Sequence, residues 1–274
     1  MKIKNLLMSV LMMAACSQAF AQEKEVLVFP ADGTATNGMV IEGTNISFKL
    51  GNDGKWKAPQ FVNAGAITAD FKQPYVNSEG AEAEGIAYIS GDNNPKDGPL
   101  SDANASTGNG YKPTTKNVPQ SGTYFMITPS KAGTVRAVVV LNANKSFFVT
   151  KSDGTMLDPA NGEYKLLQPS GDELAFDSET LKFDYNPDKD SSNNDYSVGT
   201  KLNGGMVEFN AEAGETYYVF CTGSKLGFGG VEFTEGSGPG PVGPTNVRGD
   251  LDGDGYVTVT DILILVNIFV SGSN

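Results

Sequence analysis

The strongest constraint on this chain is a series of short apolar and β-branched runs between residues 25 and 233, each ended by Gly, Asn, Asp or Pro. The runs are EVLVFP, NISFKL, APQFVNA, GIAYIS, GTYFMITP, GTVRAVVVLN, SFFVTK, EYKLLQ, LKFDYN, GMVEFNA, TYYVFC and GFGGVEF. Short strands separated by turn signals, without a sustained 3.6-residue apolar period, are typical of antiparallel sandwiches. The sequence therefore predicts an all-β fold, a jelly-roll-like antiparallel β-sandwich, over residues 22–235.

Three internal segments refine this prediction. Residues 138–141, VVVL, are apolar at consecutive positions, which is typical of a central strand covered on both faces. Residues 91–121 and 186–201 are dense in Gly, Asn, Asp, Pro and Ser, so we expect long loops there. Long loops on a rigid sandwich often carry function, which makes both segments candidate binding surfaces.

The N-terminus has the pattern of a secretory signal peptide over residues 1–21. Lys2 and Lys4 precede an apolar run, and Ala19-Phe20-Ala21 is a small-x-small cleavage site. We expect cleavage after Ala21 and a secreted or cell-surface protein. In the alternative interpretation, Met13-Ala14-Ala15-Cys16 is a lipoprotein box and Cys16 is lipidated. No later run approaches the roughly 20 apolar residues that span a bilayer.

The charge of the chain limits its partners. Loss of Lys2 and Lys4 with the signal peptide changes the formal net charge from −12 to −14. Nucleic acids need a basic surface, so we expect no nucleic-acid partner. An acidic surface is compatible with a soluble secreted protein that binds neutral glycans or calcium.

Residue types also limit the chemistry. The chain has no histidine, and after cleavage only Cys221 remains of its cysteines. This excludes an intrachain disulfide, His-based catalytic triads and His-ligated zinc. Cys221 lies in an apolar run, where we expect a buried, inert thiol. No nucleophile–base constellation is visible, so enzymatic activity stays open and is the less favoured interpretation.

Residues 236–248 alternate Gly and Pro and are predicted to form a semi-stiff linker. The next segment, DLDGDGYVTVTD, has the spacing of an EF-hand calcium loop, with Gly255 at its sixth position. Clustered carboxylates at this spacing suit Ca²⁺, which prefers six to eight oxygen ligands. The predicted ligands are Asp250, Asp252, Asp254, the carbonyl of Tyr256, Thr258 and Asp261.

An Asp at the twelfth loop position, no helix before the loop and an apolar helix-like run after it make residues 249–274 resemble a single dockerin type I repeat. In that family the repeat occurs twice, and the pair binds a cohesin module. The resemblance implies Val259 and Thr260 as partner contacts, and a cohesin-like protein or a second dockerin repeat as the partner. Because the predicted helix DILILVNIF is apolar nearly all round, a lone repeat must bury it against another protein surface. Three explanations stay open: a truncated frame, an intermolecular pair, or packing on the sandwich.

The body has a resemblance of its own. The segments GTYFMITPSKAGTVRAVVVLNANKSFFV and AGETYYVFCTGSKLGFGGVEF resemble β-sandwich modules beside pectate lyases and other secreted polysaccharide-degrading enzymes. The resemblance implies a noncatalytic carbohydrate-binding or accessory module that binds a plant polysaccharide. A structural surface protein or adhesin without glycan affinity is the first alternative, and a polysaccharide lyase or hydrolase is the second.

Aromatic side chains beside turns are the candidate glycan contacts, because a pyranose ring presents an apolar face to a flat ring. Trp56 follows the Asn-Asp-Gly turn at residues 52–54, and Tyr75 and Tyr111 are also flanked by turn residues. Each of them also fits a partly buried position in the sandwich. Trp56 is the first candidate for a sugar-stacking platform.

Overall fold

The computed structural model describes residues 24–96, 118–142, 145–179, 182–184, 201–221 and 226–236. The predicted signal peptide, linker and calcium repeat lie outside these residues, as does Tyr111. Within the described segments, no helix has the length and apolar character needed to cross a membrane.

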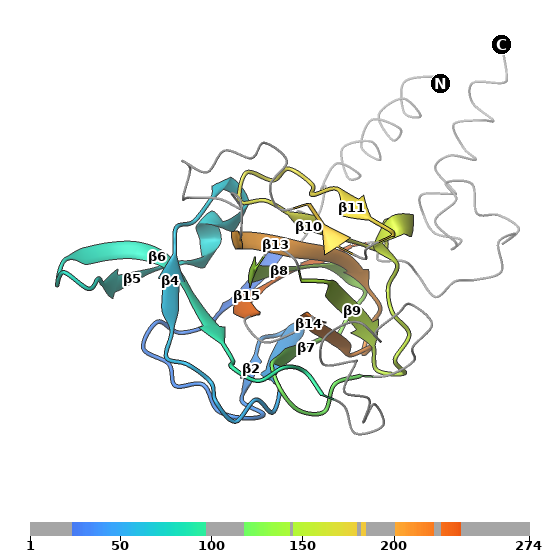
Figure 1. The fold of residues 1–274 in the computed structure, drawn as a ribbon, viewed down its shortest axis with the longest axis horizontal. Coiled ribbons are helices and arrows are strands. Elements are labelled where there is room, and N and C mark those ends of the chain that lie inside the picture. The colour runs from blue at the N-terminus through green and yellow to red at the C-terminus, as the bar shows by residue number, and fades with distance from the viewer. Residues whose placement is uncertain are drawn as a thin grey trace, which may run out of the picture.

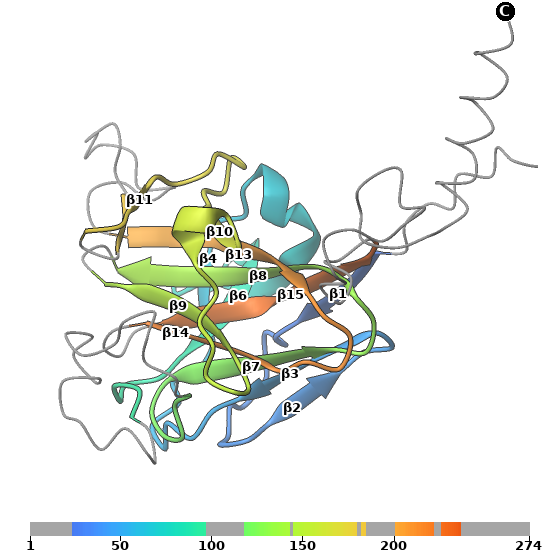
Figure 2. The same ribbon diagram turned by 90° about the vertical axis from the view of Figure 1, so that its right-hand side faces the viewer.

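The described body consists of two antiparallel β-sheets that stack face to face (Figures 1 and 2). The larger sheet has the strand order β10 (Tyr164–Leu167), β13 (Lys201–Ala211), β8 (Gly133–Asn142), β15 (Gly227–Glu235), β6 (Glu82–Ser90) and β4 (Gln60–Val62). In addition, β1 (Lys24–Val28) pairs with β15, and β5 (Lys72–Val76) pairs with β6. The second sheet has the order β2 (Val40–Glu42), β3 (Ile46–Leu50), β7 (Tyr124–Pro129), β14 (Tyr217–Cys221) and β9 (Phe147–Lys151). The all-β sandwich predicted from the sequence is confirmed.

Small elements complete the body. Strands β11 (Phe176–Asp177) and β12 (Lys182–Phe183) form a two-stranded sheet. In the connections that the structure describes lie the 3-10 helices η1 (Ala66–Phe71) and η3 (Pro159–Asn161). Asp158 caps η3, because its side chain accepts a hydrogen bond from the backbone N–H of Ala160 at 2.9 Å.

The main core lies between the two sheets, where alternate residues of each strand point inward. Phe228 of the larger sheet stacks on Phe125 of the smaller one at 4.4 Å between ring centroids. Phe48, also of the smaller sheet, packs edge-on against the Phe228 ring, with 4.9 Å between the ring centroids. These aromatic contacts between the layers fix the distance and register of the two sheets.

Strand β8 is covered on both faces, as its VVVL run predicts. Val139 belongs to the core between the sheets, whereas Val138 faces outward and packs with Phe71, Ile86 and Met206. Phe71 closes η1 and is fully buried. The helix therefore covers part of the outer face of the larger sheet. Because of this contact, β8 can carry apolar side chains on both of its faces.

Not every strand was predicted. Strands β2, β5 and β11 fall outside the predicted runs, and within the predicted LKFDYN run the described residues include β12, Lys182–Phe183. Strand β5 contains Pro74, which cannot donate a ladder hydrogen bond. The strand forms nevertheless because β5 pairs only with β6, so its outer side needs no ladder.

Candidate functional site

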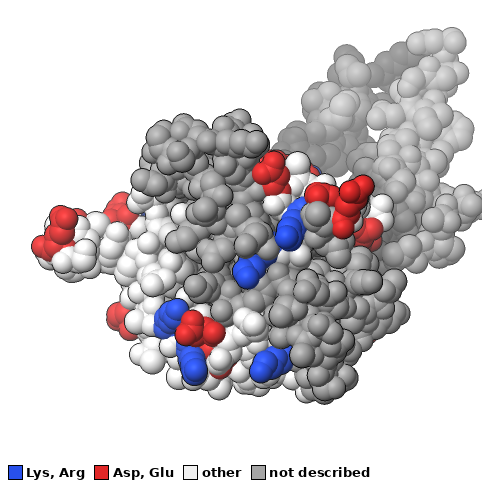
Figure 3. All heavy atoms as spheres, viewed as in Figure 1, with Lys and Arg blue, Asp and Glu red and all other residues white. Residues whose placement is uncertain are grey.

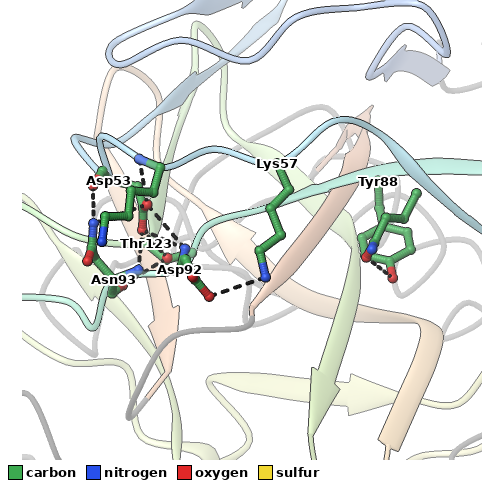
Figure 4. A network of polar contacts seen from close by, with 8 residues as sticks. Asp53, Lys57, Tyr88, Asp92, Asn93 and Thr123 are labelled. Carbon is green, nitrogen blue, oxygen red and sulfur yellow. Dashed lines mark hydrogen bonds and ion pairs between the residues drawn. The ribbon is translucent and has the colours of Figure 1, made fainter.

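A buried carboxylate organises three loops at the end of β6. Asp53 is 4% exposed, and its oxygens accept hydrogen bonds from the backbone N–H of Asp92 at 3.1 Å and of Asn93 at 2.9 Å. The Thr123 hydroxyl donates to the same carboxylate at 2.5 Å. Figure 4 shows Asp53 between these groups. Several donors per carboxylate satisfy a buried anion without an ion pair.

The local sequence explains why Asp53 adopts this position. The Asn-Asp-Gly turn places Gly54 at φ +73°, and the Lys55 N–H donates to the Asp53 carboxylate at 3.0 Å. Gly91 faces the same carboxylate so closely that any Cβ there would overlap it and the Thr123 hydroxyl. A side chain at position 91 would therefore disrupt the junction of the loops.

Further hydrogen bonds join the three loops to each other. The Asn93 side-chain amide donates to the Asp53 carbonyl, and the Thr123 N–H donates to the Asn93 carbonyl at 3.0 Å. The Gly122 N–H donates to the Asn52 carbonyl at 3.0 Å. These loops are consequently held in one arrangement, which lowers the entropy cost of binding a ligand there.

The three loops enclose an open polar pocket of about 460 Å³. Amides, carboxylates, an ammonium group and a hydroxyl line it together. The lining residues are Asn52, Asp53, Asp92, Asn93, Asn94, Lys96, Ser121 and Gly122. On the outer side, Lys57 forms an ion pair with Asp92 at 3.2 Å, visible in Figure 4.

Such a lining suits hydrogen bonding to a polar neutral ligand. Side-chain amides offer a donor and an acceptor on one group, and carboxylates accept from hydroxyls. The chain has no histidine, and the pocket contains no cysteine. The residues that line this pocket therefore offer no histidine base and no cysteine nucleophile, and their polar groups can hydrogen-bond to hydroxyl groups.

Tyr88 lies on β6 next to this network. Its hydroxyl donates to the Gln60 side chain at 2.8 Å, across the β4–β6 pair, as Figure 4 shows. Partial burial raises the pKa of Tyr88 above its usual value because desolvation penalises the phenolate. Tyr88 is therefore a neutral hydrogen-bonding group at ordinary pH.

Trp56 lies on the segment between this pocket and the core. Its indole N–H donates to the Asn37 side-chain oxygen at 3.0 Å, and the same oxygen accepts the Gly54 N–H at 2.8 Å. Its ring centroid is 5.7 Å from that of Phe125, with a tilt of 48°. Trp56 is half-buried against the main core, so it supports the loop and only part of its surface is available to a ligand.

Tyr75 lies elsewhere, on β5. Its ring stacks on Phe61 of β4 at 3.8 Å between centroids, and the two planes differ by only 5°. Phe61 was not among the aromatic residues that the sequence pattern indicated. A hint was available in Ala83, Gly85 and Ala87, because small residues at alternate positions leave room above a strand for rings from its neighbours.

The structure therefore separates Trp56 from Tyr75. Lys57, next to Trp56, donates its backbone N–H to the Ser90 carbonyl at one end of β6. Tyr75 pairs with Ala83 near the other end. Seven residues of extended strand correspond to about 23 Å, so the two aromatics do not form one platform.

The remaining predicted site residues cannot be compared with the structure. Tyr111, the calcium ligands of residues 250–261, and the partner contacts Val259 and Thr260 lie outside the described residues. Among the described residues, no group of three or more His, Cys, Asp or Glu could hold a metal ion.

Cys221 is buried at the end of β14, as predicted. Burial raises the pKa of its thiol to about 12, because the apolar surroundings penalise the thiolate. A protonated, enclosed thiol is a weak nucleophile, so the residue serves packing.

No protein-family model matches this sequence, and no curated protein is significantly similar to it.

Proposed function

We propose that this chain is a secreted, noncatalytic carbohydrate-binding or accessory module of a polysaccharide-degrading system. A C-terminal calcium-binding, dockerin-like repeat then docks the module to a partner. The observation that carries the proposal is the rigid polar pocket built around Asp53, with amides, carboxylates and Lys96 facing one open space. Glycan hydroxyls both donate and accept hydrogen bonds. The pocket offers carboxylate and amide oxygens as acceptors, and amide and ammonium groups as donors.

Three features support the binding of glycan rather than of another ligand. The pocket lies on loops of a rigid sandwich, where binding residues tend to concentrate. Trp56 adds a partly exposed aromatic surface on the adjoining segment. The negative charge of the chain disfavours nucleic acids and other polyanions.

The calcium repeat supports the second half of the proposal. The spacing of the acidic residues from Asp250 to Asp261 suits a seven-coordinate calcium ion, which would order the loop and present the apolar run that follows. A cohesin-like protein or a second repeat would then cover that run. In this scheme the sandwich binds the polysaccharide, and the C-terminal repeat attaches the sandwich to a larger assembly.

The test is affinity electrophoresis of the mature full chain, residues 22–274, in gels that contain soluble xylan, glucan, mannan or pectin. The proposal expects retardation on at least one polymer, equally with calcium and with a chelator, because none of the residues that line the pocket is a predicted calcium ligand. The double variant Asn94→Ala/Lys96→Ala should migrate freely, whereas the control Lys165→Ala, on β10, should be retarded like the wild type.

The same samples separate the alternatives. Release of reducing or unsaturated ends from any polymer would establish a hydrolase or a lyase. Free migration in every gel, without product release, would favour the surface protein or adhesin.

A further inference from the structure

Tyr88 lies on the outer face of the larger sheet. It follows Ile86 by two positions on β6, and Ile86 packs with Phe71 and Val138 on that face. Alternate residues of a strand share a face, so Tyr88 points away from the core between the two sheets. Ile86 is fully buried, whereas Tyr88 is only half-buried. Part of the Tyr88 side chain is therefore accessible to a ligand.

The strands on either side of β6 fix the position of the Tyr88 ring. On the β15 side, a Cβ at Gly227 would lie 2.5 Å from a carbon of the ring, so the ring occupies the space that this glycine leaves. On the β4 side, the Tyr88 hydroxyl donates to the exposed Gln60 side chain at 2.8 Å. An aromatic ring and a side-chain amide are thus held together at the surface, which lowers the entropy cost of binding a ligand there.

The surface of β6 connects Tyr88 with the Asp53 pocket. Lys57 lies between them, because its backbone N–H donates to the carbonyl of Ser90, two residues after Tyr88. Its ammonium group forms the ion pair with Asp92, which lines the pocket, and Figure 4 shows Lys57 between Asp92 and Tyr88. Four residues of extended chain correspond to about 13 Å. A ligand that reaches from Asp92 to Tyr88 must therefore be longer than one sugar residue.

The charges along this surface balance each other. The side chains of Lys57 and Asp92 are 42% and 49% exposed, and their ion pair leaves no net charge between the pocket and Tyr88. On the face shown in Figure 3, basic and acidic side chains of the described residues are likewise interspersed. Paired charges of this kind can hydrogen-bond to hydroxyl groups without a strong attraction for a polyanion.

We propose that Tyr88 and Gln60 form a second sugar subsite, which extends the Asp53 pocket along β6. A pyranose packs its apolar face against the accessible part of the Tyr88 ring, and its hydroxyls hydrogen-bond to the Gln60 amide. The ligand is an uncharged polysaccharide chain that occupies the pocket and the Tyr88 subsite together. This inference rests on the proposed function and adds to it the charge and the minimum length of the bound chain.

The experiment titrates the mature chain, residues 22–274, with cello-, xylo- and manno-oligosaccharides from the disaccharide to the hexasaccharide, by isothermal calorimetry. Wild-type affinity should rise steeply at the length that first reaches both subsites, because the second contact is then intramolecular. In Tyr88→Ala, the gain in affinity from the shortest oligosaccharide that binds to the hexasaccharide should shrink about tenfold. Tyr88→Phe keeps the ring and should keep most of that gain.

Two further variants separate binding from folding. Gln60→Ala removes an exposed side chain and should weaken hexasaccharide binding about threefold, the effect of one lost hydrogen bond. Because its removal leaves the core intact, this variant decides the question if Tyr88→Ala has a lower urea midpoint than the wild type. Val76→Ala, at a 67% exposed side chain on β5, should bind like the wild type.

The outcomes distinguish this inference from the proposed function. Unchanged hexasaccharide affinity in Tyr88→Ala and Gln60→Ala, with loss of binding in Asn94→Ala/Lys96→Ala, would overturn the second subsite and leave the proposed function intact. A wild-type chain that is retarded by a polymer but binds no hexasaccharide would also overturn the subsite alone. Tighter binding of oligogalacturonides than of neutral oligosaccharides would overturn the preference for uncharged chains. Absence of binding to every oligosaccharide and every polymer would overturn the proposed function, and this inference with it.

Discussion

The Thr123 hydroxyl donates to the Asp53 carboxylate at 2.5 Å, although the two residues are 70 positions apart in the sequence. This bond connects the loop before β7 to the loop after β3, and the N–H groups of Asp92 and Asn93, after the end of β6, donate to the same carboxylate. The polar pocket exists because a single buried carboxylate holds all three segments together.

Replacement of Asp53 by Ala is therefore expected to destabilise the body. The variant leaves the N–H groups of Lys55, Asp92 and Asn93 without this acceptor, and each unsatisfied buried group costs about 1–3 kcal/mol. The Thr123 hydroxyl keeps the Asn93 carbonyl as an acceptor at 2.9 Å. Allowing for water entering the gap, we expect a loss of about 3 kcal/mol in the free energy of unfolding. Urea denaturation followed by Trp56 fluorescence measures it.

The control for this prediction is Asp92→Ala, because that carboxylate is exposed and forms only a surface ion pair with Lys57. Its loss should cost no more than about 1 kcal/mol. Equal destabilisation by the two variants would show that Asp53 has no special structural role.

The Phe61–Tyr75 stack should contribute measurably to stability. A double-mutant cycle with Phe61→Ala and Tyr75→Ala is expected to give a coupling free energy of about 0.5–1.5 kcal/mol, since parallel rings at this separation interact beyond their buried area. The matched cycle pairs Phe61→Ala with Val76→Ala. A coupling no larger than in that second cycle would argue against a specific ring contact.

Stability should fall in mild alkali because of Cys221. In the unfolded chain the thiol ionises near its ordinary value of 9.0, while the folded state keeps it protonated up to a pKa of about 12. Above pH 9 the folded state thus binds more protons than the unfolded state, so stability decreases as the pH rises. One such group contributes up to about 1.4 kcal/mol per pH unit.

Urea midpoints at pH 7.5, 8.5, 9.5 and 10 test this prediction in wild type and in Cys221→Ala. The variant should show a smaller decrease between pH 9 and 10, below the ordinary pKa values of tyrosine and lysine. Burial also raises the pKa of Tyr164, which adds a second decrease that begins near pH 10 in both proteins. Parallel curves throughout would contradict the assignment to Cys221.

The C-terminal loop should bind calcium independently of the sandwich. Isothermal titration of the mature chain with CaCl₂ is expected to give one binding event, which Asp250→Ala or Asp254→Ala abolishes by removing ligands. The exposed residue Asp32 provides the control, and Asp32→Ala should bind like wild type. Absence of a binding heat when the wild-type chain, with its loop intact, is titrated with CaCl₂ would refute the calcium site.

The sequence predicted the strands well where they have an apolar face toward the core. Strand β8 is an example, because its consecutive valines indicated burial on both sides before any contact was known. Strand β5 was missed, since Pro74 is a poor strand former and is accommodated only by an unpaired outer side that tertiary structure creates. A local pattern cannot report which edge of a strand lacks a partner.

The candidate sites were less accessible to sequence analysis. Trp56 and Tyr75 were identified as aromatics beside turns, but their partners Phe125 and Phe61 come from other strands. The Asp53 network joins residues 40 and 70 positions away. An Asn-Asp-Gly turn predicts a tight loop, and only the fold determines which distant N–H groups reach its carboxylate.

The most direct test of the central proposal is the retention of the mature chain by neutral polysaccharide, compared between wild type and Asn94→Ala/Lys96→Ala. The wild type and the double variant should first give the same urea midpoint, so that a difference in retention reports on the pocket and not on folding. The proposed function predicts that the wild type is retarded and the double variant is not. Equal migration of the two proteins, with or without retardation, would contradict a carbohydrate site at the Asp53 pocket.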